Sequence, residues 1–262
     1  MTLTQRSSTK NEEIDVALSR SYLYEWLSLA FRYPDAELVA SLQSPALTLL
    51  EATLERLAGG ERDVLHPVLA GLRATSSNCD LAALQSDHRR VFSHIESSLC
   101  PPYETRYGSS HLFQQTQELS DIAGFYRAFG LELSDDAKER TDYLAIELEF
   151  LQFLCFKEAY ALEHHGPEQV EVTRDAEAKF LREHLLRWAP SFARRLQTQT
   201  GDGFYRQCVT VMLAFLRAEA ARWGCSPAEE AALQPIDGLP EGCNFSCGLE
   251  DGQSVADLIS ER

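Results

Sequence analysis

The segment from residue 140 to residue 165, RTDYLAIELEFLQFLCFKEAYALEHH, limits the possible folds of this chain more than any other segment. Its helical pattern leaves little of the circumference polar, because apolar side chains stand at Leu144, Leu148, Leu151, Phe153, Leu154 and Phe156. A helix that is apolar almost all round is buried in the middle of a bundle. We place its start at Ser134, a good N-cap residue, because Asp135 and Asp136 then lie in the first turn, where the helix dipole favours negative charge.

Helical patterns also cover most of the remaining chain. Near the start, one apolar stripe runs through Ile14, Leu18, Tyr22, Trp26 and Leu29, and Leu23 and Leu27 widen it. Further helices are expected near Asp35, over about 45–58, 61–74, 80–96, 110–129, 168–187, 190–199 and 203–222, and after Ser226, with Gly130 and Gly224 ending two of them. No strand-like alternation occurs. The fold class is therefore all-α, a single globular bundle of about ten helices.

The chain divides into three parts by composition. Residues 1–12 are polar and are expected to form a flexible N-terminus, and residues 13–232 form the all-helical domain. Residues 233–262 form a C-terminal tail that is acidic and contains Gly, Pro and Cys.

The net charge indicates what kind of partner the chain can attract. There are 24 basic and 40 acidic residues, which give a formal charge of −16. Nucleic-acid binding is disfavoured, because it depends on neutralising phosphates with Lys and Arg. A negative field attracts a cationic partner, although solubility alone also explains such a charge.

Other features of the composition indicate where the protein works. No apolar run reaches the ~18 to 20 residues of a membrane helix, and the N-terminus lacks the apolar core of a secretory signal. Seven scattered cysteines do not form a disulfide framework. We therefore expect a cytoplasmic protein without stable membrane insertion.

Few residues indicate catalysis. His88, His94 and His111 have no partner nucleophile at a suitable spacing, and the Cys243/Cys247 pair lacks the further ligands of a zinc site. The enzyme alternative is an all-α, Mg-dependent protein similar to isoprenoid synthases, in which carboxylates bind the metal. It would use Asp135, Asp136 and Glu139, but the chain has no second acidic motif. We expect a protein that is not an enzyme and that needs no metal or other cofactor.

One segment interrupts the helices, LCPPYETRYG at residues 99–108. Two prolines force an extended or turning backbone, because each fixes φ and lacks an N–H group. We expect Pro101 and Pro102 to present Tyr103 and Glu104 toward the start of the central helix. The alternative is a stiff connector between helices with Tyr103 in the core.

Three segments in this order resemble the TorD/DmsD/NarJ family of redox-enzyme maturation chaperones. They are YLYEWLSLAFRYPDAEL, then VFSHIESSLCPPYETRYG leading to DIAGFYRAFGLEL, and ERTDYLAIELEFLQFL. The resemblance implies an all-helical cytoplasmic chaperone for the catalytic subunit of a molybdoenzyme of the dimethyl-sulfoxide-reductase type. Such a chaperone binds the twin-arginine leader or the N-terminal segment until the cofactor is inserted, and so serves the Tat translocase indirectly.

The resemblance also implies a peptide-binding surface. Its members would be His88, Val91, Phe92, Pro101, Pro102, Tyr103, Asp142 and Tyr143, and we add Glu104 on chemical grounds. The family often has Asp-His where this chain has Asp142-Tyr143, so the aspartate matches and the histidine does not; His88 is a weaker match than Phe92.

Chemistry supports the same surface. Carboxylates such as Asp142 and Glu104 pair with an arginine fork, and an apolar groove lined by Phe92, Pro102, Tyr103 and Tyr143 suits the apolar leader residues. The alternatives are that Asp142 is only a first-turn acid, and that the chain is a helical scaffold with no peptide groove.

Overall fold

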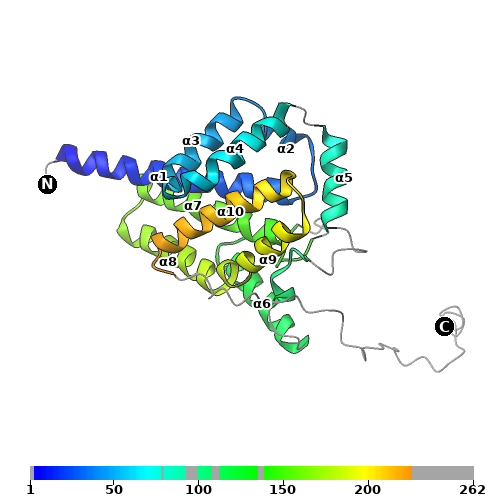
Figure 1. The fold of residues 1–262 in the computed structure, drawn as a ribbon. Coiled ribbons are helices and arrows are strands. Elements are labelled where there is room, and N and C mark those ends of the chain that lie inside the picture. Colours follow the sequence, from blue (N-terminus) through cyan, green and yellow to red (C-terminus); the bar gives the residue numbers. More distant parts are fainter. Residues whose placement is uncertain (1–2, 78–79, 93–99, 108–111, 135–138, 226–262) are drawn as a thin grey trace, which may run out of the picture.

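The computed structural model describes residues 3–77, 80–92, 100–107, 112–134 and 139–225. In that part of the chain the helices are α1 (Leu3–Phe31), α2 (Ala36–Ser41), α3 (Ala46–Leu57), α4 (Arg62–Ser77), α5 (Leu81–Phe92), α6 (Leu112–Ala128), α7 (Leu144–His164), α8 (Pro167–Phe180), α9 (Leu186–Gln199) and α10 (Phe204–Arg222). Short 3₁₀ turns occupy Gly59–Glu61 and Glu104–Arg106, and a π-helical turn occupies Leu181–Leu185. The prediction of an all-α bundle is confirmed (Figure 1).

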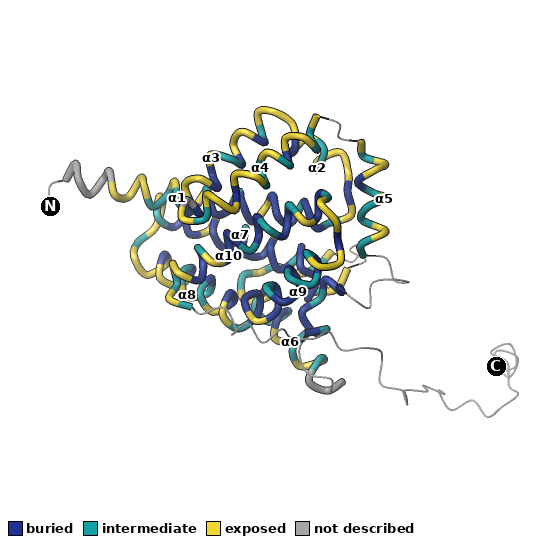
Figure 2. Tube along the Cα trace, viewed as in Figure 1, coloured by how far each residue is buried: buried dark blue, intermediate teal, exposed yellow. Residues whose placement is uncertain are grey.

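Helix α7 lies in the middle of the bundle and is largely buried, as expected (Figure 2). It runs antiparallel to α1. The Ser28 hydroxyl donates to the C=O of Ala145 at 2.9 Å, and the Ser21 hydroxyl donates to the C=O of Gln152 at 3.1 Å. Farther along, Lys10 Nζ donates to the C=O of Glu163. The C-terminal end of α1 therefore lies beside the N-terminal end of α7.

The predicted start of the central helix was wrong. Helix α7 begins at Leu144, ten residues after Ser134, and Asp135 and Asp136 lie outside the described residues. The backbone just before α7 is not helical. Tyr143 is extended, and the C=O of Asp142 accepts a hydrogen bond from the N–H of Glu104. Residues bonded in this manner cannot also form a helical turn.

The sequence predicted the buried face of α1 only in part. The helix begins at Leu3, within the predicted flexible terminus. Leu18 is 43% exposed, and Tyr22 and Leu29 are only partly buried. The buried face includes Leu23, Trp26 and Leu27, as predicted, and also Ala17, Arg20, Tyr24, Ala30 and Phe31.

Arg20 belongs to this buried face although it is charged, because its charge is fully paired inside the protein. Its guanidinium donates to Glu158 and Glu219 at 2.8 Å each and also to Glu177. All four side chains are buried, and they join α1 to α7, α8 and α10. Burial raises the pKa of Glu177 to about 8, although Arg20 opposes this shift. The network therefore fixes the register of four helices around one cation.

The end of α6 and the start of α9 were also predicted from the sequence. Gly130 follows α6 with φ +73°, and the N–H of Leu131 donates to the C=O of Tyr126 at 2.9 Å, so the predicted stop is confirmed. The predicted break after residue 187 is absent, because α9 continues through Pro190. The π-helical turn just before α9 already departs from regular α-helical bonding.

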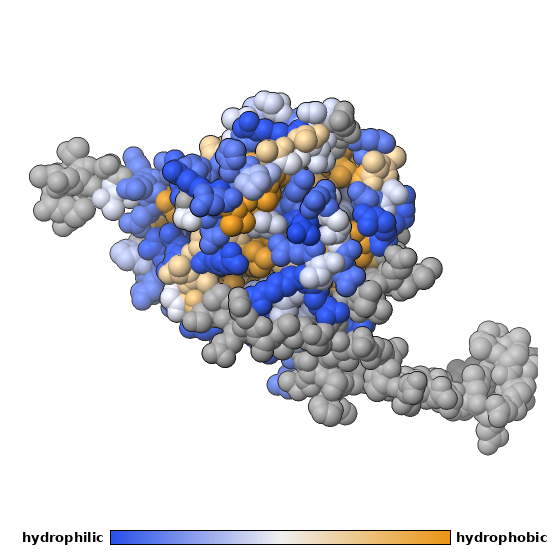
Figure 3. Space-filling view, viewed as in Figure 1, coloured by the Kyte–Doolittle hydropathy of each residue, from blue (hydrophilic) through white to orange (hydrophobic). Residues whose placement is uncertain are grey.

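The surface is mixed in character. In the view of Figure 3, hydrophilic side chains cover most of the visible face, and smaller hydrophobic patches lie among them. Among the described residues, no helix combines the length and the hydrophobicity needed to span a membrane.

Candidate peptide-binding site

The Pro-Pro segment lies against the start of α7. The N–H of Leu144 donates to the C=O of Pro102 at 2.9 Å, and the N–H of Glu104 donates to the C=O of Asp142 at 3.0 Å. Tyr103 and Tyr143 form an antiparallel bridge between these two hydrogen bonds. Pro101 and Pro102 are both buried. Because proline fixes φ, the segment enters this bridge already extended.

Tyr103 is partly buried at the edge of this bridge. Its ring centroid lies 5.5 Å from that of Tyr143, and the guanidinium carbon of Arg140 lies 5.1 Å from its centroid. Its hydroxyl donates to Glu139 at 3.3 Å. Burial and, after it, the charge of Glu139 raise the pKa of Tyr103 to about 12, so the ring stays neutral.

Asp142 is fully buried, and its carboxylate has internal partners. The backbone N–H and the hydroxyl of Thr105 donate to Oδ2 at 3.2 and 2.7 Å. Arg140 completes the set, with Nε donating to Oδ1 and NH2 to Oδ2 at 2.9 Å each. The carboxylate is therefore held in one orientation.

Glu104 is also buried, but its side chain points into the protein. Its carboxylate oxygens lie 3.1 and 3.2 Å from Nδ1 of His184, which is on the π-helical turn. Glu147 of α7 is nearby, where it accepts a hydrogen bond from the indole N–H of Trp188. Burial first, and then the charge of Glu104, raises the pKa of Glu147. Glu104 thus faces a buried ionisable cluster.

The α5 residues of the predicted site lie in an aromatic cluster. The His88 ring is 4.9 Å from that of Phe92 and 5.3 Å from that of Tyr33. Phe92 also packs edge-on against Tyr205 at 5.0 Å. Burial lowers the pKa of His88 to about 4, so the imidazole is neutral at neutral pH. Val91 lines a mainly polar hollow of about 330 Å³, together with Asp87, Arg90 and residues 200–205.

The C-terminal end of α1 connects the two groups of predicted residues. The Tyr143 hydroxyl donates to the C=O of Phe31, and the Phe31 ring is 6.0 Å from that of Phe192. Phe192 is in turn stacked on Phe92 at 6.4 Å. The structure thus brings the predicted residues to one end of the bundle, where the carboxylates of both Glu104 and Asp142 are buried.

Sequence reasoning missed several members of this region. Tyr33 is 49% exposed beside His88, and Thr105 and Arg140 hold Asp142. Tyr33 lies within the family-like segment at residues 22–38, which could have indicated it. Arg140 stands two residues before Asp142, so this local pair of opposite charges could have indicated its role.

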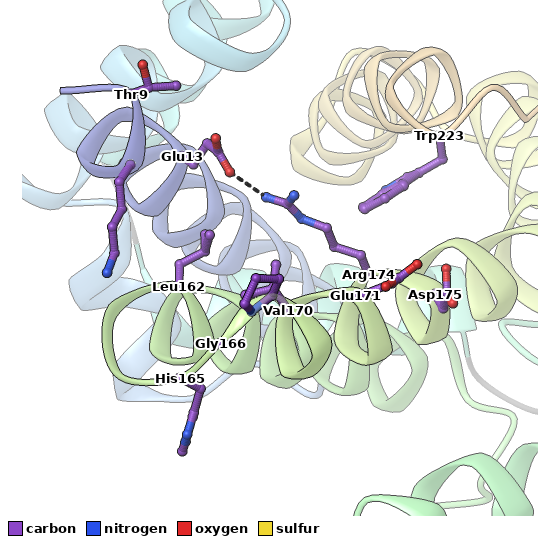
Figure 4. A pocket seen from close by; sticks show the side chains of 12 residues that line it. Thr9, Glu13, Leu162, His165, Gly166, Val170, Glu171, Arg174, Asp175 and Trp223 are labelled. Carbon is purple, nitrogen blue, oxygen red and sulfur yellow. Dashed lines mark hydrogen bonds and ion pairs between the residues drawn. The ribbon is translucent and has the colours of Figure 1, made fainter. Parts of the chain in front are cut away.

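Another cavity lies away from these residues. It has a volume of about 760 Å³ and lies where the N-terminal part of α1 meets the end of α7, the start of α8 and Trp223 (Figure 4). Across it, Arg174 donates to Glu13 at 3.0 Å. No predicted site residue lines it.

The residues of the enzyme alternative gain no support. Asp135, Asp136, His94, His111 and the Cys243/Cys247 tail lie outside the described residues. Glu139 is exposed and accepts the hydrogen bond from Tyr103. Within the described ranges, no group of three or more His, Cys, Asp or Glu side chains is arranged to hold a metal ion.

Similarity to known proteins identifies the family. The model of the nitrate reductase delta subunit family matches residues 46–194, more than half of the chain. The chain belongs to this family. Membership confirms the resemblance to the TorD/DmsD/NarJ chaperones noted in the sequence.

Individual relatives have names of the same kind. The perchlorate reductase assembly chaperone protein of Dechloromonas aromatica is 28% identical over 79% of this chain and 91% of its own length. The chaperone protein TorD of Vibrio cholerae is 27% identical over 76% of this chain and 90% of its own. The selenate reductase assembly chaperone protein of Thauera selenatis is 34% identical over 44% of this chain and 58% of its own. These relatives are chaperones and not enzymes, which supports the expectation that this chain is not an enzyme.

Proposed function

We propose that this protein is a cytoplasmic assembly chaperone for the catalytic subunit of a molybdoenzyme of the dimethyl-sulfoxide-reductase type. It binds the twin-arginine leader or the N-terminal segment of that subunit and holds it for cofactor insertion before export. Similarity over most of the chain to assembly chaperones named for reductases supports the maturation role. Release to the Tat translocase would follow, so the translocase is an indirect partner.

One observation carries the assignment of the binding site. The partly exposed ring of Tyr103 has a guanidinium on its face and the carboxylate of Asp142 beside it. This is the arrangement that recognises arginine, because a guanidinium stacks on aromatic rings and pairs with a carboxylate through two N–H groups. A leader with two arginines offers this chemistry.

The apolar part of the leader needs a second surface. The α5 cluster supplies one, because Tyr33 is half exposed and the neighbouring Val91 and Phe92 are only partly buried. His88 is neutral at this position, so it adds no positive charge that would repel arginine. An extended peptide can contact both parts because they meet at the end of α1.

Calorimetric titration of the full chain with a synthetic leader peptide tests the proposal. The peptide comes from a molybdoenzyme encoded near this protein, and a second peptide has its arginines replaced by alanine. We expect micromolar binding that weakens at least about tenfold for the alanine peptide and for Tyr103→Ala, since aromatic anchors dominate such interfaces.

Tyr160→Ala is the matched control. Tyr160 lies on α7 at the far end of the bundle, is 44% exposed, and has Lys157 over its ring at 5.9 Å. Equal loss of affinity in both variants would place the site elsewhere. No binding to the peptide or to the intact catalytic subunit would overturn the proposed function, and a purely structural connector would lose stability in Tyr103→Ala without losing affinity.

A further inference from the structure

We infer that Arg140 is an internal occupant of a guanidinium site formed by Asp142, Thr105 and Tyr103, and that an arginine of the client replaces it. This inference rests on the proposed function and names how that site is filled. Thr105 and Arg140 thereby become determinants of binding that the family resemblance did not supply.

The geometry of Arg140 is that of a ligand in a receptor. Its Nε and NH2 groups donate to the two oxygens of Asp142, both at 2.9 Å, in the fork arrangement. NH2 also donates to the hydroxyl of Thr105 at 2.6 Å, and the guanidinium lies over the ring of Tyr103. A carboxylate, a hydroxyl and an aromatic face thus receive one guanidinium.

The receptor is held in place without Arg140. Two groups of Thr105, the N–H and the hydroxyl, donate to Oδ2 of Asp142, and the C=O of Asp142 accepts from Glu104. These bonds fix the carboxylate whether or not the arginine is present. The site is therefore already ordered in the folded protein. Binding of an incoming group is favoured, because little free energy is spent on ordering the site.

Exposure differs sharply between the two partners. The Asp142 side chain is 0% exposed, whereas that of Arg140 is 47% exposed. Rotation of the Arg140 side chain into water would open one oxygen of Asp142 and the face of Tyr103. A buried carboxylate left without that donor needs a replacement, because an unpaired buried charge is unfavourable.

The chemistry selects guanidinium over ammonium. Arginine presents several N–H groups in a rigid plane, while a lysine ammonium is a compact charge that cannot span both carboxylate oxygens and stack on a ring. Arg140 and the client arginine compete for one site. The apparent affinity for the client equals the intrinsic affinity multiplied by the fraction of molecules in which Arg140 has left the site.

A small probe tests the receptor separately from the peptide. Methylguanidinium chloride, at concentrations well below denaturing ones, is added to Arg140→Ala protein while the melting temperature is measured. We expect a saturable rise of several degrees in Arg140→Ala, none in the unchanged protein, and none in Arg140→Ala/Asp142→Asn. Methylammonium should not reproduce the rise. Arg32→Ala, which removes an arginine from an exposed pair with Glu37, is the matched control.

The leader peptide then tests the competition. Affinity should rise about tenfold in Arg140→Ala, the gain expected when one charged hydrogen-bonded competitor is removed. Arg140→Lys keeps the charge and safeguards the fold, and it should give a smaller increase. Unchanged or weaker peptide binding in both variants, with no methylguanidinium effect, would overturn the inference while the proposed function stands. Stabilisation by methylguanidinium without any peptide binding would support the receptor and overturn the function.

Discussion

The hydroxyl of Tyr143 donates a hydrogen bond to the backbone C=O of Phe31, the last residue of α1. The bond ties the start of α7 to the end of the helix beside it. Both residues are buried. Since the two parts of the candidate site meet at this point, the bond also sets their separation.

Tyr143→Phe should therefore destabilise the protein by about 1–2 kcal/mol, because the C=O of Phe31 loses a buried partner. Urea denaturation followed by circular dichroism measures the change. Tyr160→Phe, an exposed tyrosine of the same helix, should change the free energy of unfolding by less than about 0.5 kcal/mol. Equal stability of the two variants would show that the Tyr143 bond contributes nothing.

Arg20→Met should cost about 3–5 kcal/mol, because it leaves three glutamates in the interior without their common cation. The free energy of unfolding in urea is the measurement. Adding Glu177→Gln to Arg20→Met should recover part of the loss, since it removes one of the buried carboxylates. Arg217→Met removes a half-exposed partner of Glu61 and should cost below about 1 kcal/mol. If Arg20→Met lowered the free energy of unfolding as little as Arg217→Met does, this account would be contradicted.

The same arginine shows where sequence reasoning reached its limit for the fold. Periodicity was enough for most helices and for the central position of α7, because apolar side chains report burial directly. On α1 it predicted the buried Leu23, Trp26 and Leu27, but it did not find Arg20, a charged residue of the same buried face. Its three carboxylate partners come from helices up to 199 positions away in the chain, and no local pattern reports such a pairing.

For the candidate site, the sequence could indicate the bridge but not what the carboxylates bond to. Two prolines before Tyr103 predicted an extended segment near the start of α7, and the structure has it there. The start of α7 itself was misplaced, since Ser134 with two aspartates is a good capping pattern on local grounds. Whether Asp142 and Glu104 are open to a ligand depends on Thr105 and His184, which only the tertiary structure brings to them.

His88 should make stability depend on pH on the acidic side. Burial lowers its pKa to about 4, below the ordinary 6.5, so the unfolded chain binds the proton more tightly than the folded one. Its contribution is present above pH 6.5 and is lost as the pH falls toward 4. Between pH 7 and pH 5 this loss amounts to about 2 kcal/mol.

His88→Phe keeps a ring against Tyr33 and Phe92 and removes the titrating group. Its free energy of unfolding, measured in urea at pH 7 and pH 5, should fall less than that of the unchanged protein. His66→Phe, at an exposed position of α4, should leave the pH dependence as it was. An identical fall in His88→Phe would show that another group is responsible.

The net charge of −16 should appear in the kinetics of client binding, given the proposed function. A negative field raises the encounter rate of a basic leader, and salt screens that field over about 8–10 Å near physiological ionic strength. We expect the association rate constant, measured by stopped-flow fluorescence with a labelled leader peptide, to fall about tenfold between low salt and 0.5 M NaCl. The dissociation rate constant should change much less, because it reports short-range contacts.

A peptide with its arginines replaced by alanine carries less charge and should show a flatter salt dependence. If both peptides respond alike, or if salt acts mainly on dissociation, the charge serves solubility rather than steering.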